Sequence, residues 1–241
     1  MSALLKVDGT SKRFRGLVAV DRLSFEVPEG GLFAVIGPNG AGKTTLFNMI
    51  AGTLAPDGGA ITFAGTPIEG LSADAVCRRG IARTFQIVRP FPALTVEDNV
   101  TIGALLHRHD VGAARQRAQE LLRRLDLFDK RQRLASTLTL PDRKRLEVAR
   151  ALATGPQLLL LDEVMAGLRP TETDRMVAIL RELNRDSGLT ILLIEHVMRA
   201  VMALASHVLV LDHGVAIAEG TPDAIVRDPA VVQSYLGAEA V

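Results

Sequence analysis

Gly37-Pro38-Asn39-Gly40-Ala41-Gly42-Lys43-Thr44 is the stretch of sequence that decides the fold. It fits the phosphate-binding pattern G-x-x-x-x-G-K-[ST] in full. Glycines let backbone N–H groups curve around phosphate oxygens, and the N-terminus of a following helix favours an anion. We expect these eight residues and Thr45 to bind ATP, with Lys43 at the β- and γ-phosphates and the Thr44 hydroxyl on Mg²⁺.

Both flanks of this loop support the prediction. Residues 32–36 form a short, wholly apolar run that leads into the loop, and residues 45–51 have helical character. Strand, glycine loop and helix is the context that the pattern requires. An accidental glycine-rich turn would not bring both flanks with it.

Composition bounds the class of protein. The chain has 241 residues, of which 48% are apolar, which is enough for one large domain or a core with a subdomain. The 28 basic and 27 acidic residues nearly cancel, and there is no Trp, so we expect no nucleic-acid partner. The single Cys77 excludes an internal disulfide and fits a cytoplasmic location. No apolar run is long enough to cross a bilayer, and the N-terminus has no signal-peptide pattern.

Two kinds of strand are expected. Residues 4–7, 18–20, 23–27 and 60–63 are short, partly alternating segments separated by turns, which favours an antiparallel layer. Three later runs are continuously apolar, as strands buried on both faces of a parallel sheet are. They cover 158–161, 190–194 and 208–211.

Helical patterns fall mainly between residues 95 and 155. Amphipathic helices are predicted over 113–127 and 145–152, and a connecting helix over 171–186 that starts with a capping box of Thr171 and Asp174. The fold class is therefore α/β: a parallel-sheet core, an antiparallel β layer and an inserted helical subdomain. We expect one domain over 1–241, with the core at about 1–86 and 156–241 and the helical subdomain at about 87–155.

Two carboxylates end the apolar run 158–161. Asp162 and Glu163 follow it directly, and ligands bind at the carboxyl ends of strands in open α/β sheets. Asp162 fits the residue that supports Mg²⁺, and Glu163 fits a general base that polarises the attacking water. An ordinary acidic strand end is the alternative, but the complete phosphate loop favours the catalytic interpretation.

Two further polar residues are candidates by position. His196 closes the apolar run 190–194 after Glu195, and it could contact the γ-phosphate, although a histidine at a strand end more often has a structural role. Gln86 lies where the helical part begins. It could ligate Mg²⁺ or position water and sense the γ-phosphate.

These motifs resemble the ATP-binding subunit of an ATP-binding-cassette (ABC) transporter over essentially the whole chain. The phosphate loop, Gln86, Asp162-Glu163 and His196 occur in that family's order and approximate spacing. The sequence is most similar to the branched-chain amino-acid importer branch, with its urea and amide relatives. The segments that carry this closer resemblance are 80–86, 91–100, 194–198, 218–222 and 235–237.

The resemblance implies a cytoplasmic ATPase, peripheral on the inner face of the cell membrane, that energises an importer. Its partners would be transmembrane permease subunits, a second cassette in a homo- or heterodimer and, indirectly, a periplasmic binding protein. Phe14 matches the aromatic that stacks on adenine, with a plain core position as the alternative. A soluble regulatory ABC-type ATPase or a phosphoryl-transferring kinase remains as a rival interpretation.

The chain departs from the family pattern at two places. The signature normally reads Leu-Ser-Gly-Gly-Gln at a helix start, and residues 138–142 read Leu-Thr-Leu-Pro-Asp instead. Pro141 has no N–H to donate, although proline starts a helix well. The run 143–145 could supply charge there or form a solvated helix face. Arg169 stands where the family has Asp or Asn, and Val164 replaces a usual Pro.

Overall fold

The computed structural model describes residues 3–85, 90–108 and 110–237. Within them, one sheet has the strand order β2-β1-β4-β5 and a second has the order β10-β9-β3-β8-β7-β6. The first contains β1 (Ala3–Phe14), β2 (Leu17–Pro28), β4 (Gly58–Phe63) and β5 (Thr66–Pro67). The second contains β3 (Leu32–Ile36), β6 (Ile81–Arg83), β7 (Leu158–Asp162), β8 (Thr190–Ile194), β9 (His207–Asp212) and β10 (Val215–Gly220).

The second sheet is parallel except at β10, which pairs with β9 in the antiparallel sense. Strands β7 and β8 are buried at every position, as their continuous apolar sequence predicts. Ile194 in β8 lies opposite Val35 on one side and Asp162 on the other. The ends of β3, β8 and β7 therefore meet at one edge of the sheet, which is where the predicted site residues follow.

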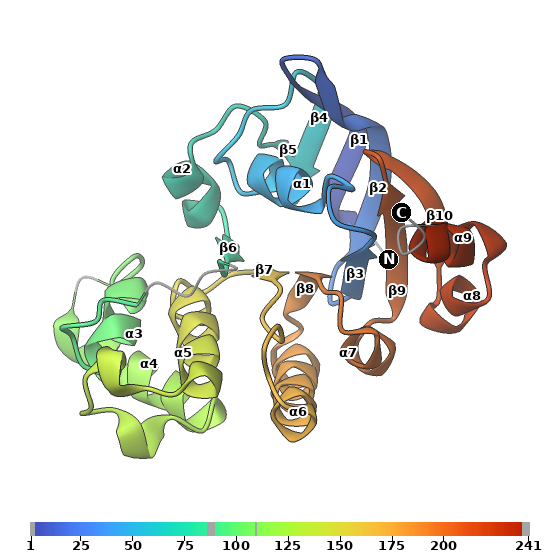
Figure 1. Ribbon diagram of the computed structural model, residues 1–241. Coiled ribbons are helices and arrows are strands. Elements are labelled where there is room, and N and C mark those ends of the chain that lie inside the picture. The colour runs from blue at the N-terminus through green and yellow to red at the C-terminus, as the bar shows by residue number, and fades with distance from the viewer. Residues whose placement is uncertain (1–2, 86–89, 109, 238–241) are drawn as a thin grey trace.

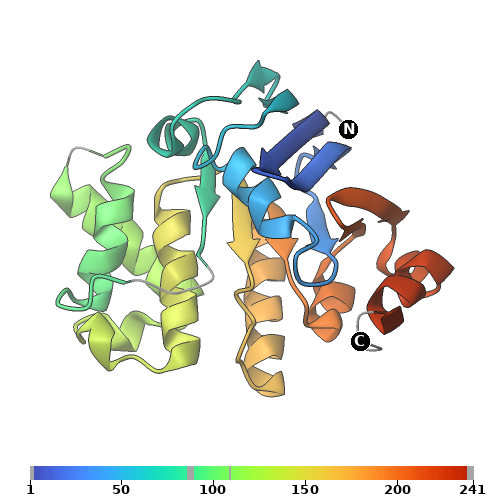
Figure 2. The same cartoon turned by 45° about the horizontal axis from the view of Figure 1, so that its top comes forward.

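Helices cover both faces of this sheet (Figure 1). Above it in that view lie α1 and the antiparallel sheet, and below it lie α5, α6 and α7. Figure 2 shows α1 crossing in front of the sheet, with α3, α4 and α5 gathered at one side. The helices are α1 (Lys43–Ile50), α2 (Ala73–Arg78), α3 (Val96–Ala104), α4 (Val111–Arg124), α5 (Leu140–Ala153), α6 (Pro170–Ser187), α7 (Met198–Leu204), α8 (Pro222–Val226) and α9 (Pro229–Gly237), with 3₁₀ turns at Phe128–Lys130 and Ala135–Thr137.

The apolar core has two parts, one on each face of the parallel sheet. Phe33, Leu160 and Leu192 point toward α1 and the antiparallel sheet. Their strand neighbours, such as Leu161 and Leu193, point toward α5, α6 and α7. Because side chains alternate along a strand, one five-residue apolar strand supplies both cores.

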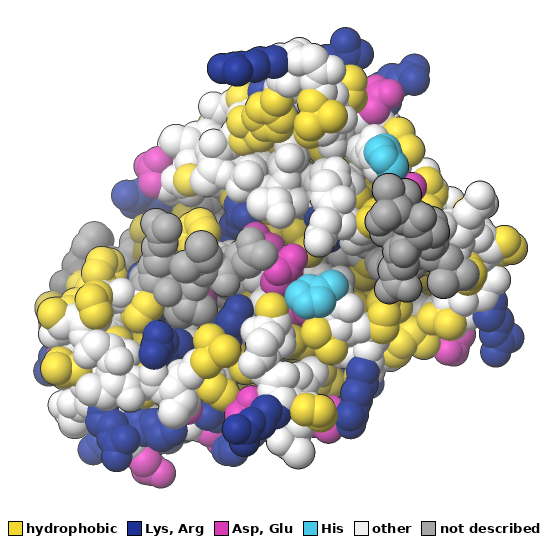
Figure 3. Space-filling model, in the orientation of Figure 1, with side chains coloured by type: hydrophobic (Ala, Val, Ile, Leu, Met, Phe, Trp, Pro, Cys, Tyr) yellow, Lys and Arg dark blue, Asp and Glu magenta, His cyan; other side chains and the backbone are white. Residues whose placement is uncertain are grey.

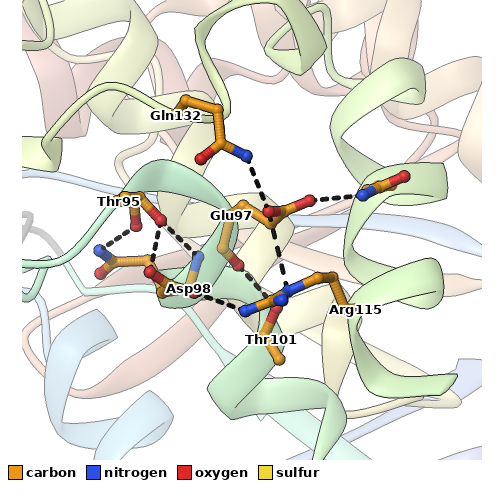
Figure 4. Close-up of polar contacts among 8 residues, drawn as sticks. Thr95, Glu97, Asp98, Thr101, Arg115 and Gln132 are labelled. Atoms are coloured by element: carbon orange, nitrogen blue, oxygen red, sulfur yellow. Dashed lines mark hydrogen bonds and ion pairs between the residues drawn. The ribbon is translucent and has the colours of Figure 1, made fainter. Parts of the chain in front are cut away.

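A buried carboxylate on α3 joins that helix to α4 and to the turn that precedes α5 (Figure 4). Glu97 is 4% exposed and accepts hydrogen bonds from Gln119 on α4 at 2.6 Å and from Gln132 at 3.0 Å. Thr95 caps α3 by accepting from the Asp98 N–H at 3.0 Å. Polar contacts therefore define how α3 meets α4, in addition to their apolar faces.

Two local predictions need correction. The first strands are longer than expected, because Arg15 in the left-handed region closes a tight hairpin from Phe14 to Leu17 and the polar residues before it stay paired across the ladder. The predicted capping box of Thr171 and Asp174 is wrong. Helix α6 begins earlier, at Pro170, and its N-terminal box joins the Arg169 N–H to Glu172 at 2.8 Å.

Among the described residues, none of the helices combines the length and the apolar composition needed to cross a bilayer.

Candidate functional site

The phosphate loop joins β3 to α1 through backbone that only glycine adopts without strain. Gly37, Gly40 and Gly42 have φ values of 145°, 83° and 101°. A Cβ on Gly37 would lie 2.0 Å from the Leu211 carbonyl oxygen, and one on Gly42 would lie 2.2 Å from that of Ala19. The loop therefore packs closely between β9 and β2, and no residue other than glycine could occupy positions 37 and 42 in this conformation.

Lys43, the first residue of α1, lies over this loop with its ammonium group against it. Its Nζ donates to the carbonyls of Gly37 at 2.7 Å and Pro38 at 2.8 Å. Burial lowers the pKa of Lys43, although the nearby carboxylates of Glu163 and Asp162 act to raise it. Lys43 is only 9% exposed, and its positive charge therefore lies against the loop that would receive a phosphate.

Asp162 is the last residue of β7, and hydrogen bonds hold both its backbone and its side chain. The Asp162 N–H donates to Thr84 Oγ1 at 3.1 Å, and its Oδ2 accepts from Arg83 Nη2 at 2.7 Å. Both members of this ion pair are buried. Asp162 is thus a fixed carboxylate, as a residue that orients a metal ion's ligands must be.

Glu163 follows in a strained conformation. Its φ of 49° is in the left-handed region, which a residue other than glycine rarely adopts. Its backbone is held from two sides: the N–H donates to the Ile194 carbonyl at 3.0 Å, and the carbonyl accepts from Lys144 Nζ on α5 at 3.0 Å. This strain re-aims the side chain as the chain leaves β7.

Glu195 and His196 leave the adjacent strand β8. Glu195 is 1% exposed; its Oε1 accepts from the Met165 N–H at 2.8 Å, and its Oε2 is buried with no hydrogen-bond partner among the described residues. Burial raises the pKa of Glu195 to about 7. His196 is exposed, at the position that strand order puts between the phosphate loop and Glu163. Figure 3 shows acidic side chains beside a histidine near the middle of this face.

Phe14 does not belong to the core. It lies at the end of β1, is 45% exposed, and has Lys12 Nζ at 5.8 Å from its ring centroid. The alternative of a plain core position is therefore wrong, and stacking on adenine stays a prediction. Gln86 lies outside the described residues, so its predicted position has no structural description here.

The start of α5 differs from the phosphate loop. Thr139 is its N-cap and Pro141 lies in its first turn. Asp142, 3% exposed, accepts from Thr139 Oγ1 at 2.9 Å, from Arg145 at 2.6 Å and from Lys130. The interpretation of 143–145 as a solvated face is wrong for Lys144 and Arg145, because Lys144 is buried and Arg145 is paired with Asp142.

Sequence reasoning gave no role to Arg83 or Asn48, and it did not foresee the contact of Lys144 with Glu163. Each is an ordinary polar residue in a local pattern, and each becomes part of the site through a partner far along the chain. The sequence feature that could have pointed to Arg83 is its position three residues before the candidate Gln86.

The residues present fit ATP and Mg²⁺. Glycine-only curvature, the lysine on the loop and the N-terminus of α1, with no acidic residue in its first turn, suit a phosphate chain. The hydroxyl of Thr44 and the carboxylate of Asp162 are the oxygen ligands that Mg²⁺ prefers.

Comparisons with known proteins agree with this geometry. A family model described as ABC transporter matches residues 20–166, and one described as branched-chain amino acid ATP-binding cassette transporter matches 217–241. The high-affinity branched-chain amino acid transport ATP-binding protein BraF of Pseudomonas aeruginosa is 38% identical over 97% of this chain and 98% of that protein. LivG of Escherichia coli, described in the same words, is 39% identical over the same shares.

Two further relatives widen the comparison. The lipopolysaccharide export system ATP-binding protein LptB of Escherichia coli is 36% identical over 98% of each chain. Among solved structures, the ADP conformation of MJ1267, an ATP-binding cassette of an ABC transporter, superposes with a TM-score of 0.90 at 31% identity over 98% of this chain and 100% of that one. The predicted α/β cassette fold is thereby confirmed, and the chain belongs to the ABC transporter family as one of its ATP-hydrolysing cassettes.

Proposed function

We propose that this chain energises an importer of branched-chain or other amino acids, as a peripheral subunit on the cytoplasmic face of the membrane. The observation that carries the proposal is the meeting of the phosphate loop, Asp162-Glu163 and His196 at one sheet edge. The substrate class follows from likeness to BraF and LivG and from the match at residues 217–241. Its partners would be permease subunits, a second cassette and, indirectly, a periplasmic binding protein.

The site residues divide the chemistry between them. Lys43 and the loop N–H groups would hold the β- and γ-phosphates, and Phe14 would stack on adenine. Thr44, Asp162 and Gln86 would hold Mg²⁺, which neutralises charge on the phosphate oxygens when bound. Glu163 would accept a proton from the water that attacks the γ-phosphorus as the bond to the bridging oxygen breaks, and His196 would hold the γ-phosphate.

The helices at about 87–155 would act as a unit that responds to the nucleotide. Lys144 on α5 donates to the carbonyl of Glu163, and Phe85, directly before Gln86, donates its N–H to Glu147 on α5 at 3.1 Å. Movement of α5 therefore reaches both the general base and the segment that carries Gln86. This supports a role for Gln86 in coupling nucleotide to the membrane subunits.

We further propose that the two ATP sites of the dimer are unequal and that the partner is a different cassette. In the family's dimer, the start of α5 completes a site on the partner chain. Here that start lacks the N–H of Pro141 and already holds the carboxylate of Asp142. The site built on this chain's phosphate loop would hydrolyse ATP, and the site completed by Pro141 would be slow.

Uptake in cells tests the transported class. In a strain that lacks this chain, labelled leucine, isoleucine and valine should no longer be taken up, and wild-type chain should restore uptake while Glu163→Gln should not. Loss of urea or amide uptake with intact amino-acid uptake would assign the chain to those relatives. Co-purification with lipopolysaccharide-export components, or with no membrane protein, would contradict an import role.

A further inference from the structure

Arg83 bridges the two elements that would hold Mg²⁺. Its Nη1 donates to Asn48 Oδ1 on α1 at 2.6 Å, and its Nη2 donates to Asp162 Oδ2 at the end of β7 at 2.7 Å. The side chain of Arg83 is 8% exposed and that of Asp162 is 3% exposed. The guanidinium is thus a rigid buried fork between two elements that the sequence separates widely.

Asn48 places the other end of this bridge on the metal-binding face of α1. Residues four apart on a helix lie on the same face, one turn from each other. Thr44, the hydroxyl expected on Mg²⁺, is four residues before Asn48. A contact that fixes Asn48 relative to Asp162 therefore also fixes Thr44 relative to Asp162.

The surroundings of Arg83 keep the fork in place. The ring centroids of Phe47 and Phe85 lie 5.8 Å and 5.5 Å from its Cζ. Thr84, the next residue, holds the Asp162 backbone. Arg83 thus holds the side chain of Asp162, and Thr84 holds its backbone. The same segment continues in sequence to residue 86.

We propose that Arg83 is a positioning residue that sets the spacing between the Thr44 and Asp162 ligands of Mg²⁺. The inference rests on the proposed function, because it needs a metal–nucleotide complex at this site. The geometry matters as well as the charge. Lysine at position 83 would keep the positive charge beside Asp162, but its one nitrogen does not reproduce the planar fork in which Nη1 and Nη2 hold separate partners. Partners that orient metal ligands typically contribute about 10–100-fold to metal affinity.

The experiment compares binding of a fluorescent ATP analogue to the full chain with Mg²⁺ and with EDTA. In the wild type, Mg²⁺ should tighten binding. Arg83→Lys and Asn48→Ala should each lower this metal-dependent gain by about tenfold, while affinity in EDTA stays within about twofold of the wild type. The double variant should lose no more than either single variant, because both remove the same bridge.

Thr53→Val is the matched control. It removes a hydroxyl that donates to the Asn48 carbonyl at 3.0 Å and lies 3.3 Å from Asn48 Oδ1, and it leaves the Arg83 arm intact, so it should bind as the wild type does. Mn²⁺ affinity by paramagnetic resonance gives a readout independent of turnover, and thermal unfolding identifies variants that do not fold.

Three results would separate a failure of the proposed bridge from a failure of the proposed function. Undiminished metal-dependent gain in folded Arg83→Lys or Asn48→Ala, or additive losses in the double variant, would overturn the bridge. If the variants lost as much affinity for the ATP analogue in EDTA as in Mg²⁺, the bridge would also be overturned, because Arg83 would then support nucleotide binding without any specific effect on the metal. No tightening by Mg²⁺ in the wild type would instead contradict the proposed function.

Discussion

Helices α1 and α5 each start at a predicted phosphate contact, α1 in this chain's own site and α5 in a partner's site, yet their N-termini are built in opposite ways. Helix α1 starts from Gly42 in the left-handed region, has no acidic residue in its first turn and carries Lys43 at its first position. Helix α5 starts from Thr139, contains a proline and carries the buried Asp142. Both ends have the same helix dipole, so the dipole alone does not make an anion site.

The difference shows how a helix N-terminus becomes available to an external phosphate. At α1 the glycines permit the tight backbone curvature, and Lys43 adds positive charge. At α5 the negative charge is already present in the chain, where Arg145 and Lys130 neutralise it. Burial raises the pKa of Asp142, but hydrogen bonds from Lys130 and Thr139 and the nearby charges lower it below its ordinary value on balance.

The largest expected effect separates binding from chemistry at α1. Lys43→Ala removes a charge-assisted contact of about 1.5–3 kcal/mol, so it should weaken ATP binding and abolish turnover. Glu163→Gln should keep binding, lower turnover by at least about 100-fold, and trap an ATP-bound dimer. Nucleotide affinity and phosphate release with the partners present check both variants. Near-wild-type turnover in Glu163→Gln would show that Glu163 is not the general base.

The next effect concerns α5 directly. Pro141→Gly in the purified single chain restores an N–H donor, and turnover should rise on the order of ten- to a hundredfold if that donor limits the composite site. Pro170→Gly, in the first turn of α6, is the matched control and should leave turnover unchanged. High turnover of the wild-type chain alone, with no rise in Pro141→Gly, would mean that Thr139 and the helix dipole suffice.

A smaller effect is expected at the junction between the two regions. Gln86→Ala should bind ATP nearly as the wild type does and lose stimulation by the membrane complex, because the residue would report the nucleotide to the helical part. The exposed Gln116 on α4 offers a control substitution to Ala. Equal stimulation of the Gln86→Ala variant and the wild type would exclude Gln86 from coupling.

The smallest expected effect is on stability and depends on pH. The pKa of Glu195 is raised from 4.5 to about 7, which corresponds to at most about 3 kcal/mol. Between these pH values the folded chain keeps a proton that the unfolded chain releases, so stability from this group falls as pH rises through the window. The groups around it are Glu163, Lys144 and the N–H groups of Met165 and His196.

Glu195→Gln should therefore match the wild type near pH 5 and exceed its unfolding midpoint near pH 8, by roughly 2–4 °C for each kcal/mol. Thermal unfolding of both proteins across this range is the measurement, with the exposed Glu182→Gln as control. Parallel curves for the wild type and Glu195→Gln would show that the carboxyl group is ionised throughout.

Local patterns predicted most of the core. The apolar runs 158–161 and 190–194 became the central strands β7 and β8, and the α1 region followed the loop as expected. Element ends were less predictable, because they depend on partners. The start of α6 was misplaced since Arg169 and Glu172, rather than Thr171 and Asp174, close its first turn.

The sequence by itself determined the phosphate loop, because one window of eight residues contains both the backbone freedom and the charge that a phosphate needs. It also determined that Asp162-Glu163 and His196 end strands. Only the tertiary structure decided how these residues are held. The Arg83 bridge joins Arg83 to residues that lie 35 and 79 positions away in the sequence. It exists because strand order places β6 beside β7 and because α1 packs on that face of the sheet. Contacts over such separations depend on the packing of whole elements, which no local pattern encodes.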